Sequence, residues 1–200
     1  MDHGLQHRKK LAAMRRIQDA ALDLFEAQGF DAVAIEAVAA AAEVSPRTVY
    51  RYFGSKEMLV IWDEEDELPL SPLAAEFAAV DPVTLLRGTF RAAFARMDEA
   101  QLRLIRRRVA LVYRHSAIEA AYVLHAHRKS RLIAAAVGPL GGDPFRTEIF
   151  VHAFVGGVIG ALRLWCHAGF DSPPFEYIDR ALALLEQGFD DTDSKRTDPS

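Results

Sequence analysis

The chain has 200 residues, of which 50% are hydrophobic and 26% charged, the composition of a globular protein with room for a sizeable core. The formal net charge of -4 excludes a surface that is basic overall, so any binding of nucleic acid has to depend on a local basic patch. The single cysteine, Cys166, excludes an intramolecular disulfide and a cysteine-based metal site, which favours a reducing interior.

The N-terminal segment MDHGLQHRKK lacks the apolar core of a signal sequence. The longest apolar stretch, 149–162, has about 14 residues, whereas a membrane span needs about 20. His152 and three glycines interrupt this stretch. We therefore expect a buried helix, in a cytoplasmic protein that does not associate with a membrane.

The spacing of apolar residues, punctuated by glycine and proline, predicts an all-α fold. Residues 1–10 are expected to form a flexible basic arm, in which Arg8, Lys9 and Lys10 either contact DNA or simply keep the terminus soluble. A first helix should follow from about residue 10 to residue 28. A second, short helix should begin at Ile35, because apolar residues recur there at i, i+3, i+4 and i+7.

A three-residue turn separates this second helix from a third, predicted over about 46–53. Ser45 is a suitable N-cap and Pro46 a suitable first helical residue. Gly54 is expected to end the third helix, and Ser55 is expected to cap a fourth.

The rest of the chain predicts a larger helical body. An acidic run, 63–67, separates this body from the segment before it. Longer helices are expected at about 82–98, 100–114, 116–137, 144–168 and 174–188. The predicted domains are a flexible arm at 1–10, a three-helix head at 11–56, a helical bundle at 57–189 and a disordered tail at 190–200.

Two short helices joined by such a turn form a helix-turn-helix arrangement. The opposite face of the third helix carries polar groups, while the angle between the helices would be fixed by apolar contacts of Val38, Val44, Val49 and Phe53. Arg47 can donate two parallel hydrogen bonds to a guanine edge in the major groove. The hydroxyls and charges suited to phosphate oxygens belong to Thr48, Tyr50, Arg51, Tyr52 and Lys56.

Residues 15–59 resemble the DNA-binding domain of TetR-family regulators, most clearly over 39–59, AAAAEVSPRTVYRYFGSKEML. Four short motifs occur at the spacing that is typical of the family. They are an Ala-Ala pair before the turn, then Val-Ser, Tyr-x-Phe and Ser-Lys-Glu. The resemblance implies that Pro46 and Arg47 face the bases and that Lys56 binds a phosphate. It also implies groove and phosphate contacts by Thr48, Tyr50 and Tyr52.

Two positions depart from the family pattern. Ala34 stands where many members have a threonine whose hydroxyl caps the second helix and approaches the DNA backbone, so that contact is in doubt. Glu43 stands in the turn where glycine is common. This substitution is expected to cost little if the backbone there stays in an ordinary region.

The resemblance further implies a ligand-responsive repressor that leaves a palindromic operator when a small effector binds its C-terminal body. Because one recognition helix reads only a few base pairs, we expect a homodimer. Small residues of the 144–168 helix are candidates for the dimer seam, although close packing within one chain explains them equally well. They are Gly156, Gly157, Gly160 and Ala161.

Aromatic and polar side chains of the body are candidates for an effector site, and the alternative is that they form plain core. They are Phe90, Phe94, Tyr113, Tyr122, His125, Phe154 and Trp165. The body is also similar to a TetR subgroup described as binding acyl-CoA-like ligands. Arginines between Arg103 and Arg108, together with Arg114, would suit the anionic part of such a ligand.

Two other classes of protein are less consistent with the sequence. An enzyme is disfavoured because His125 and His127 lie two residues apart, on different faces of a helix, and no Gly-rich phosphate loop, HExxH or nucleophile elbow occurs. We expect no catalytic residues, no cofactor and no metal. The alternative function is a helical protein-interaction module that does not bind DNA sequence-specifically.

Overall fold

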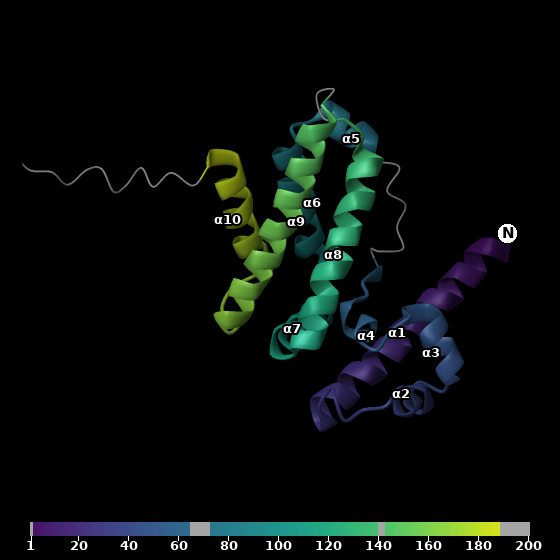
Figure 1. The fold of residues 1–200 in the computed structure, drawn as a ribbon. Helices are drawn as coiled ribbons and strands as arrows, with labels where there is room; N and C mark the ends of the chain where they lie inside the picture. The colour runs from purple at the N-terminus through teal and green to yellow at the C-terminus, as the bar shows by residue number, and fades with distance from the viewer. Residues whose placement is uncertain (1, 65–72, 140–142, 189–200) are drawn as a thin grey trace, which may run out of the picture. The chain divides into compact units, whose positions relative to one another are not determined.

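The computed structural model describes residues 2–64, 73–139 and 143–188, and the regular elements in these ranges are the helices α1 to α10 (Figure 1). The all-α prediction is confirmed. The chain divides into two compact units, the first comprising residues 1–69 and 100–126 and the second residues 70–99 and 127–200. The predicted tail at 190–200 lies outside the described residues.

Most helices agree with the predicted ranges, but α1 begins earlier than predicted, α4 begins later, and the sequence did not indicate α5. The first part of the chain forms α1 (Asp2–Gln28), α2 (Ile35–Ala41), α3 (Pro46–Phe53) and α4 (Met58–Ile61). The remaining helices are α5 (Leu73–Ala79), α6 (Pro82–Arg96), α7 (Glu99–Arg114), α8 (Ser116–Val137), α9 (Pro144–His167) and α10 (Pro174–Gln187).

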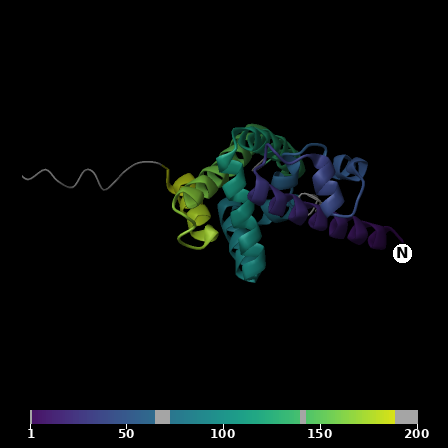
Figure 2. The same cartoon turned by 90° about the horizontal axis from the view of Figure 1, so that it is seen from below.

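The expected flexible arm over residues 1–10 is wrong, because α1 already begins at Asp2 and runs without interruption to Gln28 (Figure 2). No proline interrupts this segment, and its leucine, glutamine, arginine and lysine residues favour a helix. The exposed Arg8 and Lys9 therefore stand on a helix and not on an extended chain that could follow a minor groove.

The first unit is built around a core to which α1, α2, α3 and α4 all contribute. Ile17 of α1, Val38 of α2 and Val49 of α3 are each at most 1% exposed. Leu59 and Val60 of α4 are completely buried in the same cluster. The domain boundary expected at residue 56 is therefore displaced, since α4 packs with the head.

The turn between α2 and α3 follows from how α2 ends. The amide of Glu43 donates to the oxygen of Ala40 at 3.2 Å, and the amide of Val44 donates to the oxygen of Ala39 at 2.9 Å. This pair of bonds is the Schellman arrangement, which needs a left-handed residue after the C-cap. Glu43 takes that conformation, with φ of 53°. The condition under which Glu43 was expected to cost little is therefore not met, and the position is strained.

The ends of α3 are set by local hydrogen bonds. The hydroxyl oxygen of Ser45 accepts from the amide of Thr48 at 3.2 Å, and Pro46 occupies the first turn. Gly54, with φ of 76°, ends the helix by donating to the oxygen of Tyr50 at 2.8 Å. Ser55, in contrast, does not cap α4, which begins at Met58 without a side-chain cap.

Ala34 precedes α2 without a side-chain cap, as expected for alanine. The first turn of α2 therefore lacks the side-chain acceptor that a threonine at this position would supply.

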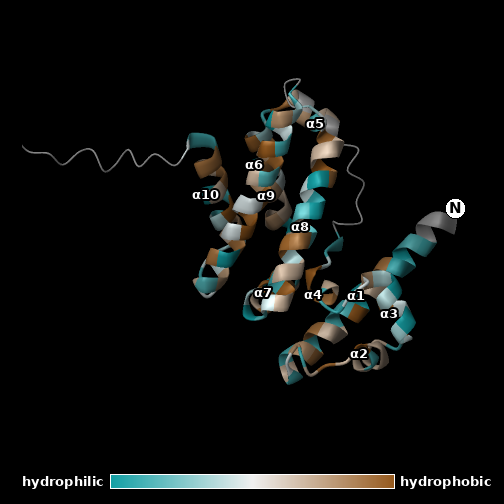
Figure 3. Cartoon of the chain, viewed as in Figure 1, coloured by the Kyte–Doolittle hydropathy of each residue, from teal (hydrophilic) through white to brown (hydrophobic). Residues whose placement is uncertain are grey.

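In the second unit α9 packs along α10, and Phe154, Ile178 and Leu182 form part of their shared core. By length and composition α9 could cross a membrane, since its most apolar 18 residues have a mean hydropathy of 1.7, yet only 22% of that window is buried. The prediction of a buried helix therefore holds only for the face of α9 that packs in the core with α10. Phe145 and Ile149 are 73% and 55% exposed, and Figure 3 shows apolar positions along much of α9.

We predict that Glu43→Gly stabilises the fold by about 1 kcal/mol, because glycine adopts the left-handed conformation without the steric cost that a side chain incurs. Chemical denaturation would measure the change in the free energy of unfolding. Ala37→Gly, at an exposed position inside α2, is the matched control and should destabilise by about 1 kcal/mol. A loss of stability in Glu43→Gly would contradict the strain assigned to this residue.

Candidate nucleic-acid interface and effector site

The third helix separates an apolar face from a polar one. Val49 and Phe53 are 1% and 6% exposed and hold α3 in the core of the first unit. Arg47, Tyr50 and Arg51 are exposed, and Tyr50 retains 51% of its accessible surface despite its aromatic ring. The structure thus brings the candidates for base and phosphate contact together on the outer side of a helix whose inner side is fixed.

The other candidates on α3, Pro46, Thr48 and Tyr52, are half-buried, and Thr48 and Tyr52 contact side chains close in the sequence. The hydroxyls of Thr48 and Ser45 are 3.0 Å apart and share a hydrogen bond. The guanidinium of Arg51 lies 4.9 Å from the ring centre of Tyr52, a cation–π contact. Pro46 is half-buried at the start of the helix. These contacts restrict the side-chain motion of Thr48, Arg51 and Tyr52.

Lys56 does not belong to this exposed face. Its ammonium donates to the oxygen of Phe30 and lies 4.4 Å from the ring centre of Phe30 and 5.6 Å from that of Phe25. The expected phosphate contact would require Lys56 to leave these partners, and it stays a prediction. The Ser-Lys-Glu pattern locates the residue in the chain, but the direction of its side chain depends on Phe25 and Phe30, about 25 to 30 residues earlier.

Sequence reasoning missed two polar residues of α1 that hold the head together. The Nε of Arg16 donates to the oxygen of Ala42 at 3.1 Å, next to the turn before α3. The amide of Gln18, which is 3% exposed, donates to the oxygens of Leu59 at 3.1 Å and Trp62 at 2.8 Å. A glutamine on a core-facing position of α1 was the available signal, because buried polar groups need partners.

Arg107 of α7 is used inside the first unit. Its Nε donates to Oε1 of Glu26 at 2.8 Å, and its Nη2 donates to Oδ1 of Asp23 at 2.6 Å. These two hydrogen bonds, chiefly the one to Glu26, raise the pKa of the Arg107 guanidinium above its ordinary value. Both acidic partners lie on α1, about 80 residues earlier in the chain.

Arg108 makes a second set of contacts, to the end of α4. Its Nε and Nη2 donate to the oxygens of Val60 at 2.9 Å and Ile61 at 2.7 Å, and its Nη1 donates to Oδ2 of Asp63 at 2.7 Å. Its side chain is 15% exposed. The interpretation of this arginine-rich segment as a binding site for an anionic ligand is therefore wrong for Arg107 and Arg108.

Three of the seven effector-site candidates gather in the second unit. The ring of Phe90 on α6 lies 6.3 Å from Phe94 and 5.7 Å from Phe154 on α9, between ring centres. Phe154 is buried, whereas Phe90 and Phe94 are half-buried against the same core. This cluster is the part of the predicted site that the second unit assembles.

The other candidates lie elsewhere. Tyr113 and Tyr122 pack against the core of the first unit, and His125 is half-buried on α8. Trp165 is fully buried, and its indole donates to the oxygen of Ser172 at 2.7 Å. Since this bond joins α9 to the segment before α10, Trp165 has a structural role and not the one predicted.

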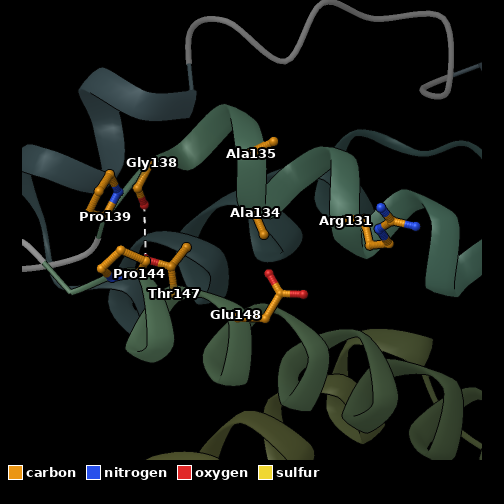
Figure 4. A pocket seen from close by; sticks show the side chains of 8 residues that line it. All are labelled: Arg131, Ala134, Ala135, Gly138, Pro139, Pro144, Thr147 and Glu148. Carbon is orange, nitrogen blue, oxygen red and sulfur yellow. Dashed lines mark hydrogen bonds between the residues drawn. The ribbon is translucent and has the colours of Figure 1, made fainter.

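A pocket of about 420 Å³ lies between the end of α8 and the start of α9 (Figure 4). Arg131 and Glu148 border it, and the buried Thr147 donates from Oγ1 to the oxygen of Gly138 at 2.9 Å. None of the predicted effector-site residues lines this pocket. Within the described ranges no group of three or more histidine, cysteine, aspartate or glutamate side chains could hold a metal ion.

The four small residues of α9 divide between two faces. A Cβ on Gly157 would lie 3.5 Å from Leu185 and 3.8 Å from Ala181 on α10, and Ala161 is 4% exposed, so both face the same chain. A Cβ on Gly156 or Gly160 would meet nothing within 4 Å. Gly157 and Ala161 therefore pack against α10 and also line the groove between the two helices, and their place in a dimer seam stays a prediction.

Comparison with known proteins agrees with this geometry. Residues 17–61 match the family model described as bacterial regulatory proteins of the tetR family, and residues 80–190 match the MftR C-terminal domain. The chain is 33% identical to the HTH-type transcriptional regulator TcmR of Streptomyces glaucescens, over 81% of this chain and 76% of that protein. It is 29% identical to the putative mycofactocin biosynthesis transcriptional regulator MftR of Mycobacterium tuberculosis, over 56% and 58% of the two chains.

Solved structures show the same fold. FadR from Thermus thermophilus aligns with a TM-score of 0.50 at 23% identity, over 94% of this chain and 98% of its own. NalD from Pseudomonas aeruginosa aligns with a TM-score of 0.54 at 18% identity, over 92% and 99%. With both family models and a long curated relative in agreement, the chain belongs to the TetR family of DNA-binding, ligand-responsive transcriptional regulators.

Proposed function

We propose that this regulator is a cytoplasmic repressor that binds a palindromic operator as a homodimer and is released by a small effector. The observation that carries the proposal is the exposed polar face of α3, opposite the buried Val49 and Phe53. Family membership disfavours both catalysis and the alternative of a helical protein-interaction module. The partners are double-stranded DNA, an effector and a second copy of the chain.

In this proposal Arg47 reads a base, because it is exposed in the first turn of α3, the end that enters the major groove. Tyr50 and Arg51 contact phosphates from the same face. Pro46, Thr48 and Tyr52 support this surface from half-buried positions. Lys56 would have to leave Phe30 to reach a phosphate, so it has no part in the proposed contact set.

We predict that Arg47→Ala and Arg51→Ala impair DNA binding in different ways. Loss of a bidentate guanine contact should cost about 1–3 kcal/mol per half-site on the preferred sequence and relax specificity at one base pair in each half-site. Loss of one phosphate contact per subunit should weaken binding to all sequences and reduce the slope of log K against log salt by about 0.9 per subunit, which is about 1.8 for the dimer. Selection from a random DNA pool followed by salt-dependent anisotropy would measure both, and unchanged sequence preference in Arg47→Ala would contradict the assignment.

The homodimer is proposed to form through the outer face of α9 and α10. Leu164 and Leu184 are 61% and 48% exposed and line an apolar groove of about 240 Å³ between the two helices. Gly160 lines the same groove, and Gly156 and Gly160 leave open space in which another helix could approach closely. Exposed apolar patches of this kind commonly mark protein–protein interfaces.

We predict that the double substitution Leu164→Glu and Leu184→Glu converts the dimer to a monomer, because two buried carboxylates per subunit would lose their hydration. Sedimentation velocity at micromolar concentration would measure the change. Leu132→Glu is the matched control, since this leucine of α8 is 63% exposed and lies outside the α9–α10 groove. Monomeric wild-type protein, or a double variant that still dimerises, would refute this interface.

An acyl-CoA-like ligand is the proposed effector. The cluster of Phe90, Phe94 and Phe154 offers an apolar environment that could enclose an acyl chain. The Thermus thermophilus FadR structure contains lauroyl-CoA, which makes this compound a suitable first probe. Because Arg107 and Arg108 are bound within the first unit, the phosphates of such a ligand would need other partners.

We predict that lauroyl-CoA raises the melting temperature, by roughly 5 to 10 °C at a hundredfold excess over its Kd, because it binds the folded protein alone. Coenzyme A without an acyl chain is the control and should have a much smaller effect, with intermediate chain lengths in between. Thermal denaturation across the series would measure this. Equal melting temperatures with every chain length would reject an acyl-CoA effector.

A further inference from the structure

The C-terminal end of α4 is held from two sides. The backbone oxygens in the last turn of a helix lack intrahelical partners, so other groups have to supply hydrogen bonds. Here Gln18 of α1 donates to the oxygens of Leu59 and Trp62, at 3.1 and 2.8 Å. Arg108 of α7 donates to the two oxygens between them, those of Val60 and Ile61. Of these four consecutive carbonyls, the outer two accept hydrogen bonds from Gln18 of the head, and the inner two accept hydrogen bonds from Arg108 of α7.

We propose that Arg108 is a positioning residue that fixes the orientation of the DNA-binding head on α7, and thereby sets the operator spacing that the dimer accepts. This inference rests on the proposed function, because spacing matters only to a protein that binds two half-sites at once. A guanidinium suits this role, since its planar set of donors can hold two carbonyls and the Asp63 carboxylate in one fixed arrangement.

The contacts of α4 lead directly to the recognition helix. Trp62, the residue after α4, is 5% exposed and packs edge-on against Phe53 with 5.8 Å between the ring centres. Phe53 is the last residue of α3 and is itself buried. A shift of the α4 end relative to α7 would therefore carry the C-terminal end of α3 with it, while the packing inside the head stays intact.

Arg107 adds a second connection between α7 and the head. It binds Asp23 and Glu26 on α1, but these carboxylates are 71% and 41% exposed, so water screens this pair more than the contacts of Arg108. We therefore assign the orientation mainly to Arg108, whose side chain is 15% exposed. The adjacent residues Arg107 and Arg108 of α7 thus bind α1 and α4 respectively. A movement of α7 would therefore act on both helices.

The experiment compares full-length wild type with Arg108→Met, Arg108→Lys and Gln18→Leu. The DNA probes are the palindrome selected by the wild type, the same palindrome with its centre lengthened or shortened by one or two base pairs, and a single half-site. For Arg108→Met we expect affinity for the optimal palindrome to fall by a factor on the order of ten, with the altered spacings bound almost as well as the optimal one. Half-site affinity should stay at the wild-type value.

Arg108→Lys should resemble Arg108→Met, because an ammonium cannot reproduce the planar set of donors. Gln18→Leu removes hydrogen bonds from the same end of α4 without touching α7, so it should lower the melting temperature and keep the spacing preference. The proposal is overturned if Arg108→Met retains the wild-type preference, if its half-site affinity falls as much as its palindrome affinity, or if Gln18→Leu flattens the preference equally. A wild type that selects no palindrome would instead refute the proposed dimeric operator binding.

Discussion

Packing of the inner face of α3 against α1 and α2 is the interaction on which the DNA-binding surface depends. An eight-residue helix is too short to be stable in water by itself, so its order comes from burying Val49 and Phe53. That burial also determines which side chains remain outside, because residues a turn apart share a face. Arg47 and Arg51 are four residues apart and are exposed together for this reason.

Polar side chains then fix the orientation of the short helices that the apolar core holds together. Hydrophobic contacts are not directional, whereas a hydrogen bond from a buried donor to a particular carbonyl is. Arg16 holds the carbonyl of Ala42 beside the turn, and Gln18 and Arg108 hold the end of α4. An unpaired carbonyl in these places would cost about 1–3 kcal/mol, which opposes alternative arrangements of the head.

The periodicity of the sequence was sufficient for all the described helices except α5, for the turn before α3 and for the exposed face that includes Arg47, because these are local properties. It failed where a side chain chooses among distant partners. Lys56 turns to Phe30, and Arg107 and Arg108 turn to α1 and α4, through contacts 26 to 84 residues apart in the chain. The strain at Glu43 was within reach, since glycine in related turns signals a left-handed conformation.

The glycines of α9 explain how one helix can contact its own chain and still offer a face to another. Successive residues of an α-helix are rotated by about 100°, so Gly157 and Ala161 share one face while Gly156 and Gly160 share the next. The first pair approaches α10, and the second pair has open space beside it. Two adjacent pairs of small residues therefore allow close approach on both faces, which a single pair four residues apart could not provide. The same reasoning explains why α9 is apolar enough to resemble a membrane span while only part of it is buried in one chain.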